Sequence, residues 1–203
     1  MRASPSVRRA LKSDRATVVP TLARAFEADP VLNYFARQDA ARARAIETIF
    51  DVSFVDLTLP YGETWMTDDG RGVALWAPPN KWSTLRGVLA GPRLIAAVGL
   101  SNVLARMRAV ERVQARHPKP PHYYLYALGV DPPHQGRGLG SALLRAVLSR
   151  CDADGASAYL EASTADNARL YGRHGFVVTE ELSLGPDAPT VSLMWRAPNP
   201  AAS

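Results

Sequence analysis

Residues 128–144 read LGVDPPHQGRGLGSALL, and this stretch decides the fold. A strand ending at Val130 leads into a proline-containing loop, after which a glycine-rich run opens a helix. The first amide groups of a helix have no partners within it, and the helix dipole places partial positive charge there. Such a start suits a pyrophosphate group. The glycines at 136, 138 and 140 let the backbone approach an anion, and Arg137 adds positive charge.

A glycine-rich helix start occurs in several nucleotide-binding folds, so its spacing has to discriminate among them. A dinucleotide-binding fold would recruit Glu161, about twenty residues downstream, as the ribose-binding acid. Three features oppose that fold. The glycines are spaced G-x-G-x-G with Ser141 following, several residues separate the strand from the first glycine, and too little chain remains to complete a doubly wound sheet. A P-loop is opposed because no Gly-Lys-Ser/Thr follows the glycines.

Composition narrows the class of protein. A hydrophobic content of 47% over 203 residues predicts one globular domain, 1–203. No apolar run reaches the length of a membrane span and the N-terminus lacks a signal-peptide core, so we expect a cytoplasmic protein without a membrane partner. The net charge is +5, but the basic residues are scattered, which disfavours a nucleic-acid partner. The single cysteine, Cys151, falls in a helical pattern and is expected to be a buried structural thiol.

In the first half of the chain, the sequence pattern predicts helices before and after a β-hairpin. The expected elements are a strand at 7–11, a helix capped by Ser13-Asp14 and stopped by Asp29-Pro30, a helix at 39–57, strands at 63–67 and 71–76, and a helical region at 82–116 broken near Gly91-Pro92. The second half alternates: strand 123–130, helix 140–153, strand 158–161, helix 166–173, and strands 176–184 and 191–196. This order predicts a mixed sheet.

Two segments carry a family resemblance. Gln135, Gly138 and Gly140 match the Q/R-x-x-G-x-G/A pyrophosphate loop of the GNAT acetyltransferases, and LEASTADNARLYGRHGFVVTEEL at 160–182 resembles that family's second cofactor segment. Along nearly its whole length the chain is also similar to puromycin N-acetyltransferase and its relatives. The resemblance implies a single-domain α/β GNAT fold with a mixed, mostly antiparallel sheet flanked by helices. It also implies a splay between the two central strands.

Acetyl-CoA is the cofactor that the resemblance implies, lying in the splay between the strands that end near Val130 and Glu161. Gly129 fits a β-bulge there, whose amide would stabilise an oxyanion; an ordinary strand-end glycine is the alternative. The core for acetyl-CoA spans about 121–196, and about 26–120 shapes the acceptor site. The expected cofactor-binding residues are Leu128, Gly129, Val130, Gln135, Gly136, Arg137, Gly138, Leu139, Gly140, Ser141, Asn167 and Tyr171.

The catalytic role of Tyr171 follows from the same resemblance, whereas the base is inferred from its place at a strand end that faces the splay. Tyr171 is the expected general acid for the departing thiolate, with a core tyrosine as the alternative. Glu161 is the leading general base, unless an arginine pairs with it. Asn167 either bonds the pantetheine arm or caps a helix. The weaker candidates for the base are His122, Tyr124 and Asp29, and the histidines expected to be plain loop or helix-end residues are His134 and His174.

The acceptor region has no transferable motif. Asp29, Tyr34, Phe35 and Tyr124 are expected to bind the substrate. An aromatic acceptor pocket and ordinary core packing both remain open for the aromatic residues Tyr34, Phe35, Trp65, Trp76 and Trp82.

The function predicted on these grounds is transfer of an acetyl group to the amine of a small molecule by direct attack in a ternary complex. Antibiotic inactivation is one form of it, no metal is implied, and the protein is expected to be a monomer or homodimer. Two alternatives stay open: acetylation of a protein N-terminus or lysine, and a non-catalytic acyl-CoA-binding sensor.

Overall fold

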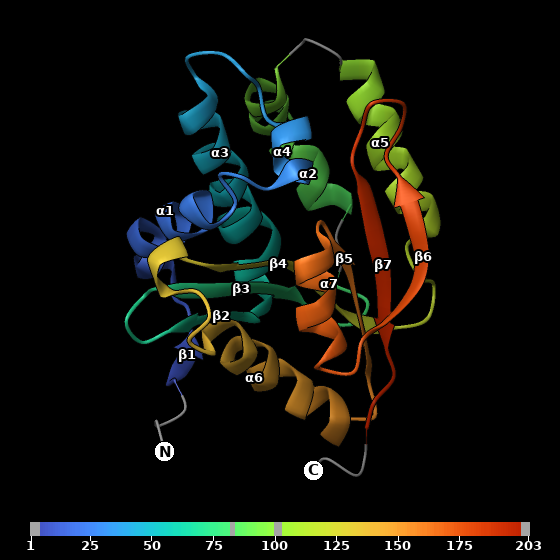
Figure 1. Ribbon diagram of the computed structural model, residues 1–203. Coiled ribbons are helices and arrows are strands. Elements are labelled where there is room, and N and C mark those ends of the chain that lie inside the picture. Colours follow the sequence, from blue (N-terminus) through green and yellow to red (C-terminus); the bar gives the residue numbers. More distant parts are fainter. Residues whose placement is uncertain (1–4, 82–83, 100–102, 200–203) are drawn as a thin grey trace.

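The computed structural model describes residues 5–81, 84–99 and 103–199, which form one seven-stranded sheet with the order β1-β2-β3-β4-β5-β7-β6 (Figure 1). Every neighbouring pair is antiparallel except β4 and β5. The mixed, mostly antiparallel sheet is therefore confirmed. The strands are β1 Val7–Arg9, β2 Thr64–Thr67, β3 Gly72–Ala77, β4 His122–Val130, β5 Ser157–Ala162, β6 Val177–Ser183 and β7 Thr190–Arg196.

Helices cover both faces of the sheet. They are α1 Arg15–Ala25, α2 Pro30–Phe35, α3 Arg42–Asp51, α4 Thr84–Val98, α5 Val103–Arg116, α6 Leu139–Ala153 and α7 Ala165–Gly172, and a π-helical turn, Val52–Thr58, continues α3. Alternation along β3 assigns the faces. Ala74 and Trp76 pack in the cluster that contains α6 and α7, whereas Val73 and Leu75 pack with α1 and α3. In Figure 1, α6 lies on one side of β2–β4 and α1 and α3 on the other. We call these the α6 face and the α1 face.

The two central strands part soon after they meet. β4 and β5 pair only at His122 with Ser157, Tyr123 with Ala158, and Tyr124 with Tyr159. Beyond that point β4 continues to pair with β3, and β5 with β7. The predicted splay between the central strands is therefore confirmed, and it separates the ends of β4 and β5 that carry Val130 and Glu161.

A β-bulge in β4 lies at Tyr126. Leu75 pairs with Ala127 while the next residue, Trp76, pairs with Leu125, so Tyr126 is the extra residue. The bulge reverses the alternation of β4. Tyr126 and Ala127 consequently both pack on the α1 face, where a regular strand would turn one of them away.

Gly129 is not the bulge that we expected, because it pairs in regular register with Val73. A β-carbon at Gly129 would lie 2.9 Å from the Ala25 Cβ and 2.9 Å from a Leu22 methyl carbon. The requirement for glycine therefore comes from the close approach of α1 to β4.

Three expectations for the helices also need correction. Asp29-Pro30 begins a further helix, α2, since the Asp29 carboxylate caps the amides of Val31 and Leu32. Asp14 makes no capping bond to α1; its carboxylate binds Arg8 and the Leu11 amide instead. α4 continues through Gly91-Pro92, held by Leu94 packing near Val52 and Leu57. None of the helices in the described ranges is long and apolar enough to span a membrane.

Substitution of Gly129 by alanine is expected to lower the free energy of unfolding by about 1–3 kcal/mol, because the added methyl group overlaps two side chains of α1. Gly91→Ala is the matched control: it adds the same methyl group inside a helix where nothing lies within 4 Å, and should be neutral or slightly stabilising. Urea unfolding of both variants measures the difference. A Gly129→Ala protein as stable as the native one would contradict the packing explanation.

Candidate active site

The glycine loop has the backbone geometry of an anion site. Gly136 and Gly138 adopt φ values of +71° and +83°, which residues with side chains rarely reach, and a β-carbon on either would meet nothing within 4 Å. α6 begins immediately afterwards at Leu139, and its N-cap, Gly138, supplies no capping side chain. The first-turn amides are therefore left for a ligand, and the open space beside the glycines fits a pyrophosphate.

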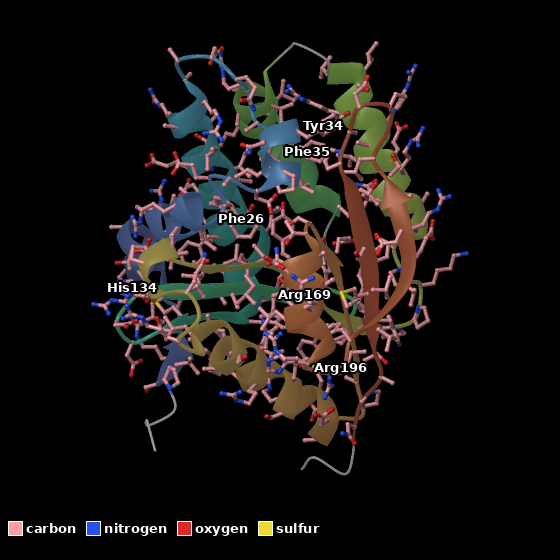
Figure 2. The ribbon with its side chains drawn as sticks, viewed as in Figure 1. Phe26, Tyr34, Phe35, His134, Arg169 and Arg196 are labelled. Carbon is pink, nitrogen blue, oxygen red and sulfur yellow. The ribbon has the colours of Figure 1, made fainter. Side chains whose placement is uncertain are left out.

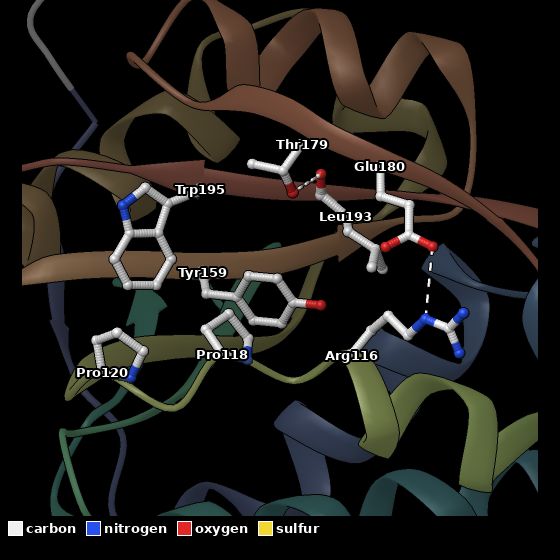
Figure 3. Close-up of a pocket in the computed structure, with 8 residues that line it drawn as sticks. All are labelled: Arg116, Pro118, Pro120, Tyr159, Thr179, Glu180, Leu193 and Trp195. Carbon is white, nitrogen blue, oxygen red and sulfur yellow. Dashed lines mark hydrogen bonds and ion pairs between the residues drawn. The ribbon is translucent and has the colours of Figure 1, made fainter.

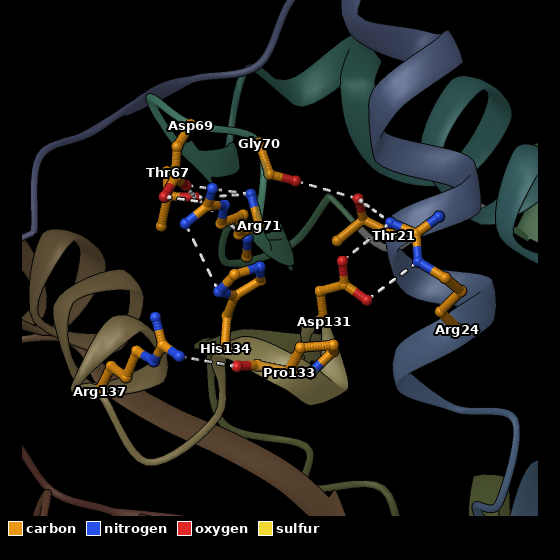
Figure 4. Close-up of polar contacts among 11 residues, drawn as sticks. Thr21, Arg24, Thr67, Asp69, Gly70, Arg71, Asp131, Pro133, His134 and Arg137 are labelled. Carbon is orange, nitrogen blue, oxygen red and sulfur yellow. Dashed lines mark hydrogen bonds and ion pairs between the residues drawn. The ribbon is translucent and has the colours of Figure 1, made fainter.

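Polar contacts hold the loop in place (Figure 4). The Gln135 side-chain amide donates to the Val130 carbonyl over 3.1 Å, and the exposed Arg137 guanidinium donates to the Pro133 carbonyl over 3.1 Å. The nearby acid, Asp131, is paired with Arg24 of α1 at 2.9 Å, which lowers its pKa. Because this carboxylate is already neutralised, it opposes an incoming anion less. His134 belongs to this loop, as expected, and its Nδ1 lies 3.5 Å from the guanidinium of Arg71, which precedes β3.

Among the described strands, none pairs with the edge of β4 that faces the splay. Leu128, Gly129 and Val130 pair with Ala74, Val73 and Gly72 of β3 on their other side, and β5 has left the ladder by then. Backbone donors and acceptors at such an edge need partners from water or a ligand. An extended chain with amide groups could supply them.

Glu161 lies on the α1 face, two residues after Tyr159 on β5. Its Oε2 accepts a hydrogen bond of 2.8 Å from the Tyr124 hydroxyl, while Oε1 is buried without a hydrogen-bond partner in the described chain. Burial raises the Glu161 pKa to about 7, although the nearby Tyr124 and Tyr159 hydroxyls act in the opposite direction. None of the ion pairs formed by arginines with described side chains involves this carboxylate, so the arginine-paired alternative has no support from that part of the chain.

Aromatic rings enclose this carboxylate. Tyr124 stacks on Tyr159 with ring centres 6.0 Å apart, and Tyr126 and His117 meet Tyr124 edge to face. The Tyr159 hydroxyl is likewise buried without a partner among the described groups. Tyr159 and Glu161, two residues apart on β5, thus present polar atoms without a hydrogen bond of ordinary geometry on the same face. Because such atoms are costly to bury, they indicate a place where a ligand supplies the missing bond.

His122 is occupied elsewhere. Its Nδ1 lies 2.7 Å from the Pro120 carbonyl oxygen, which can only accept, so Nδ1 carries the proton. Its Nε2 then faces the His117 Nε2 at 3.2 Å as the acceptor. Burial lowers the pKa of both rings, that of His117 to about 4, so this pair is neutral at pH 7.

Tyr171 sits in the main core cluster on the α6 face, 7% exposed and edge to face with Phe176. Its pKa is raised, first by burial and then by the negative charge of Asp29. The Asp29 carboxylate caps α2 through Oδ1 and accepts a hydrogen bond from the Ser163 hydroxyl through Oδ2. The Asn167 side chain donates to the same hydroxyl over 3.2 Å. Asn167 is not the cap of α7, because Thr164 holds that position.

The predicted aromatic residues do not gather in one place. Tyr34 and Phe35 of α2 pack on the cluster that contains Tyr159 and Leu193 (Figure 2). Trp76, however, is fully buried beneath α6, and the half-buried Trp65 packs on that same cluster and contacts Arg9 and Glu63, so neither lines a pocket with them. Trp82 lies outside the described residues.

Several residues of this site escaped prediction. Ser163, Tyr126, Tyr159 and His117 lie around Glu161 and Asp29, and the buried Arg106 donates to the Tyr34 and Ala36 carbonyls at the end of α2. Alternation along β5 could have placed Tyr159 beside Glu161. The bulge that brings in Tyr126 has no sequence signal.

The structure also has two surface cavities, of which one borders the outer side of the Tyr159 ring and the other lies away from this group. One, of about 280 Å³, is bounded by Tyr159, Trp195, two prolines and the Arg116–Glu180 ion pair (Figure 3). The other, of about 550 Å³, is polar and lies between α1 and α3. Neither includes Glu161 or the glycine loop.

Comparison with known proteins gives matches of one kind. The model of the acetyltransferase (GNAT) family matches residues 46–176. A solved structure described as histone acetyltransferase HPA2 and related acetyltransferase, from Corynebacterium glutamicum, superposes with a TM-score of 0.76 at 28% identity, covering 97% of this chain and 98% of that one. Drosophila melanogaster polyamine N-acetyltransferase, which forms N-acetylagmatine, superposes with a TM-score of 0.62 at 20% identity, covering 95% and 99%, and shows the fold alone.

A curated relative matches over a shorter stretch. The mycothiol acetyltransferase of Acidimicrobium ferrooxidans is 40% identical over 77 residues, which is 36% of this chain and 22% of that protein. The matched part thus spans about a fifth of the relative's length.

Replacing Glu161 by glutamine should stabilise the protein above pH 7. Because the folded pKa of about 7 exceeds the ordinary 4.5, the native protein loses stability as the pH rises from 4.5 through 7. Glutamine does not ionise, so Glu161→Gln should gain up to roughly 3 kcal/mol over the native protein at pH 8 and almost nothing at pH 4. Urea unfolding at both pH values measures this gain. Glu180→Gln, at a half-exposed ion pair, is the control expected to show none; a gain independent of pH for Glu161→Gln would contradict the burial argument.

Proposed function

Because the chain belongs to the GNAT acetyltransferase family, we propose that it transfers the acetyl group of acetyl-CoA to the amine of a small molecule. One observation carries the proposal. A buried carboxylate with a pKa of about 7 lies on one side of a splay whose other strand leads directly into an uncapped, glycine-lined helix start. The first group suits proton transfer from an amine, and the second suits a pyrophosphate.

Acetyl-CoA would bind along the end of β4 in this proposal. The pyrophosphate lies on the amides of residues 136–141, with Arg137 beside it, and the pantetheine arm bonds the free edge of Leu128 to Val130. Support comes from the open backbone groups at both places. Bound there, the cofactor supplies an activated thioester. Residues of about 121–196 thus hold the cofactor, and those of about 26–120 shape the acceptor site.

Glu161 is the proposed general base. An ammonium must lose a proton before it can attack, and a base with a pKa near 7 is about half ionised at neutral pH. The Tyr124 hydroxyl holds Oε2 in place, which leaves Oε1 free for the acceptor or a bridging water. As the new C–N bond forms, an amide of the free β4 edge would stabilise the oxyanion on the former thioester carbonyl.

Tyr171 is the proposed general acid. When the C–S bond breaks, the departing thiolate needs a proton, and a phenol whose pKa is raised stays protonated until that moment. The hydrogen bonds that Asp29 accepts from Ser163 and two α2 amides argue against it as a second base. Asp29 instead holds α2 against the β5–α7 connection.

The acceptor we favour is a small cationic amine. Glu161 supplies negative charge, and Tyr124 together with Tyr34 and Phe35 of α2 supplies aromatic surface nearby. Solved structures of this fold include agmatine, polyamine and arylalkylamine N-acetyltransferases, which agrees with this class. An aminonucleoside such as puromycin belongs to it as well. Protein acetylation is the second candidate, since the C. glutamicum structure carries a histone acetyltransferase description.

The test is release of the CoA thiol from acetyl-CoA in the presence of agmatine, a polyamine, an arylalkylamine, puromycin or a lysine peptide. We expect release with at least one small amine. Tyr171→Phe and Glu161→Gln should reduce kcat at least tenfold, and Glu161→Gln should also abolish the acidic limb of the pH profile near pH 7. Tyr123→Phe is the matched control, because it removes a hydroxyl that accepts from Arg150 in the last turn of α6, at the other end of that helix from the glycine loop.

Three outcomes would change the assignment. Release with the lysine peptide alone would replace the small-molecule acceptor by a protein. Acetyl-CoA binding without release for any amine would favour the sensor. Full activity of Tyr171→Phe would leave Tyr171 as a packing residue only.

A further inference from the structure

Ser141 and His174 form a contact that the proposed chemistry does not use. Ser141 is the third residue of α6, and its Oγ lies 2.9 Å from the Nε2 of His174. The two residues come from different segments, since His174 follows the end of α7. The imidazole therefore reaches the first turn of α6, the turn that opens at the glycine loop.

The backbone of His174 is anchored on both sides. Its amide donates to the Tyr171 carbonyl over 2.8 Å, and its carbonyl accepts from the Arg196 Nε over 2.8 Å. Arg196 is itself fixed by a buried ion pair with Asp152. These bonds fix the backbone from which the imidazole extends, and the ring is half-buried where it meets Ser141.

The direction of this hydrogen bond decides what the Ser141 hydroxyl can do. A serine hydroxyl has one hydrogen and two lone pairs. If His174 Nε2 donates, the Ser141 hydrogen is free to point at an anion on the α6 amides; if Nε2 accepts, that hydrogen is consumed. The protonation of Nε2 thus sets whether Ser141 is a donor or an acceptor toward the loop.

Charges around His174 come from three elements. Arg145 of α6, Arg173 after α7 and Arg196 of β7 face the ring, and burial together with these charges lowers the His174 pKa. An anion bound at the start of α6 places an opposite charge nearby and acts in the other direction. Anion binding and proton uptake by His174 are therefore linked.

We propose that His174 is a positioning residue of the anion site: it donates to Ser141 Oγ and so directs the serine hydroxyl toward the bound pyrophosphate. This inference depends on the proposed function, because the anion is the pyrophosphate of acetyl-CoA. It assigns a role to a histidine that we expected to be a plain helix-end residue. Linkage also requires that CoA affinity rise as the pH falls toward the His174 pKa, since the CoA-bound protein holds the proton more tightly.

The test compares binding of CoA and of pantetheine, which lacks the phosphates, by calorimetry at pH 8 and pH 6. His174→Leu and Ser141→Ala should each weaken CoA binding about three- to tenfold, the loss expected for one hydrogen bond, and leave pantetheine binding unchanged. The double variant should be no weaker than either single one, because both remove the same interaction. His174→Gln keeps a donor and should retain affinity at pH 8, but lose the gain between pH 8 and pH 6.

A second readout does not involve activity or affinity. The His174 imidazole, assigned by comparison with His174→Gln, should titrate at a higher pH in the NMR spectrum when CoA is present. Native CoA binding together with unchanged affinity in His174→Leu, or an equal loss for pantetheine, would overturn the inference and leave the proposed function intact. Failure of the native protein to bind CoA would overturn both.

Discussion

The site depends on the separation of two parallel strands. β4 and β5 share only three residue pairs before they diverge, although each continues to pair with its outer neighbour. Backbone groups on the inner edges lose their partners as a result, and a chain with amide groups can replace them. The same divergence carries the end of β4 toward the glycine loop and leaves Glu161 on the face of β5 where Tyr159 packs with residues of α2 and α5. Both halves of the candidate site therefore follow from one irregularity in the sheet.

The proposed acceptor side of the splay is built from neutral groups around one ionisable carboxylate. Tyr124, Tyr126, Tyr159 and His117 surround Glu161, and burial brings its pKa to about 7. The bulge at Tyr126 contributes to this arrangement by keeping two successive residues of β4 on the α1 face. Burial of Glu161 costs stability at neutral pH, and an uncompensated cost of this kind is typical of functional sites. The Asp29 and Ser163 contact joins α2 to the connection between β5 and α7.

The fold could be predicted because its signals come from residues close together in the sequence. The site could be predicted only in part, because its geometry depends on packing between distant residues. The glycine run at 136–140, the hairpin turn at 68–70 and the β-α alternation after residue 121 each act within a few residues, so the sheet, α6 and α7 were predictable. Gly129 was misread because its neighbours, Leu22 and Ala25, lie about a hundred residues away in the chain. The role of Trp76 stayed open for a similar reason: alternation places it on one face but does not say which helix covers it. Asp29-Pro30 is typical both of the end of one helix and of the start of the next, and only the end was predicted from the sequence.

The central claim, that acetyl-CoA lies in the splay with its pyrophosphate on the start of α6, is tested most directly by backbone amide chemical shifts during titration with acetyl-CoA. The largest changes should fall on residues 128–130 and 136–141, with smaller ones at Asn167 and Tyr171. Changes confined to the polar cavity between α1 and α3, near Arg15 and Arg44, would contradict the account and place the cofactor elsewhere.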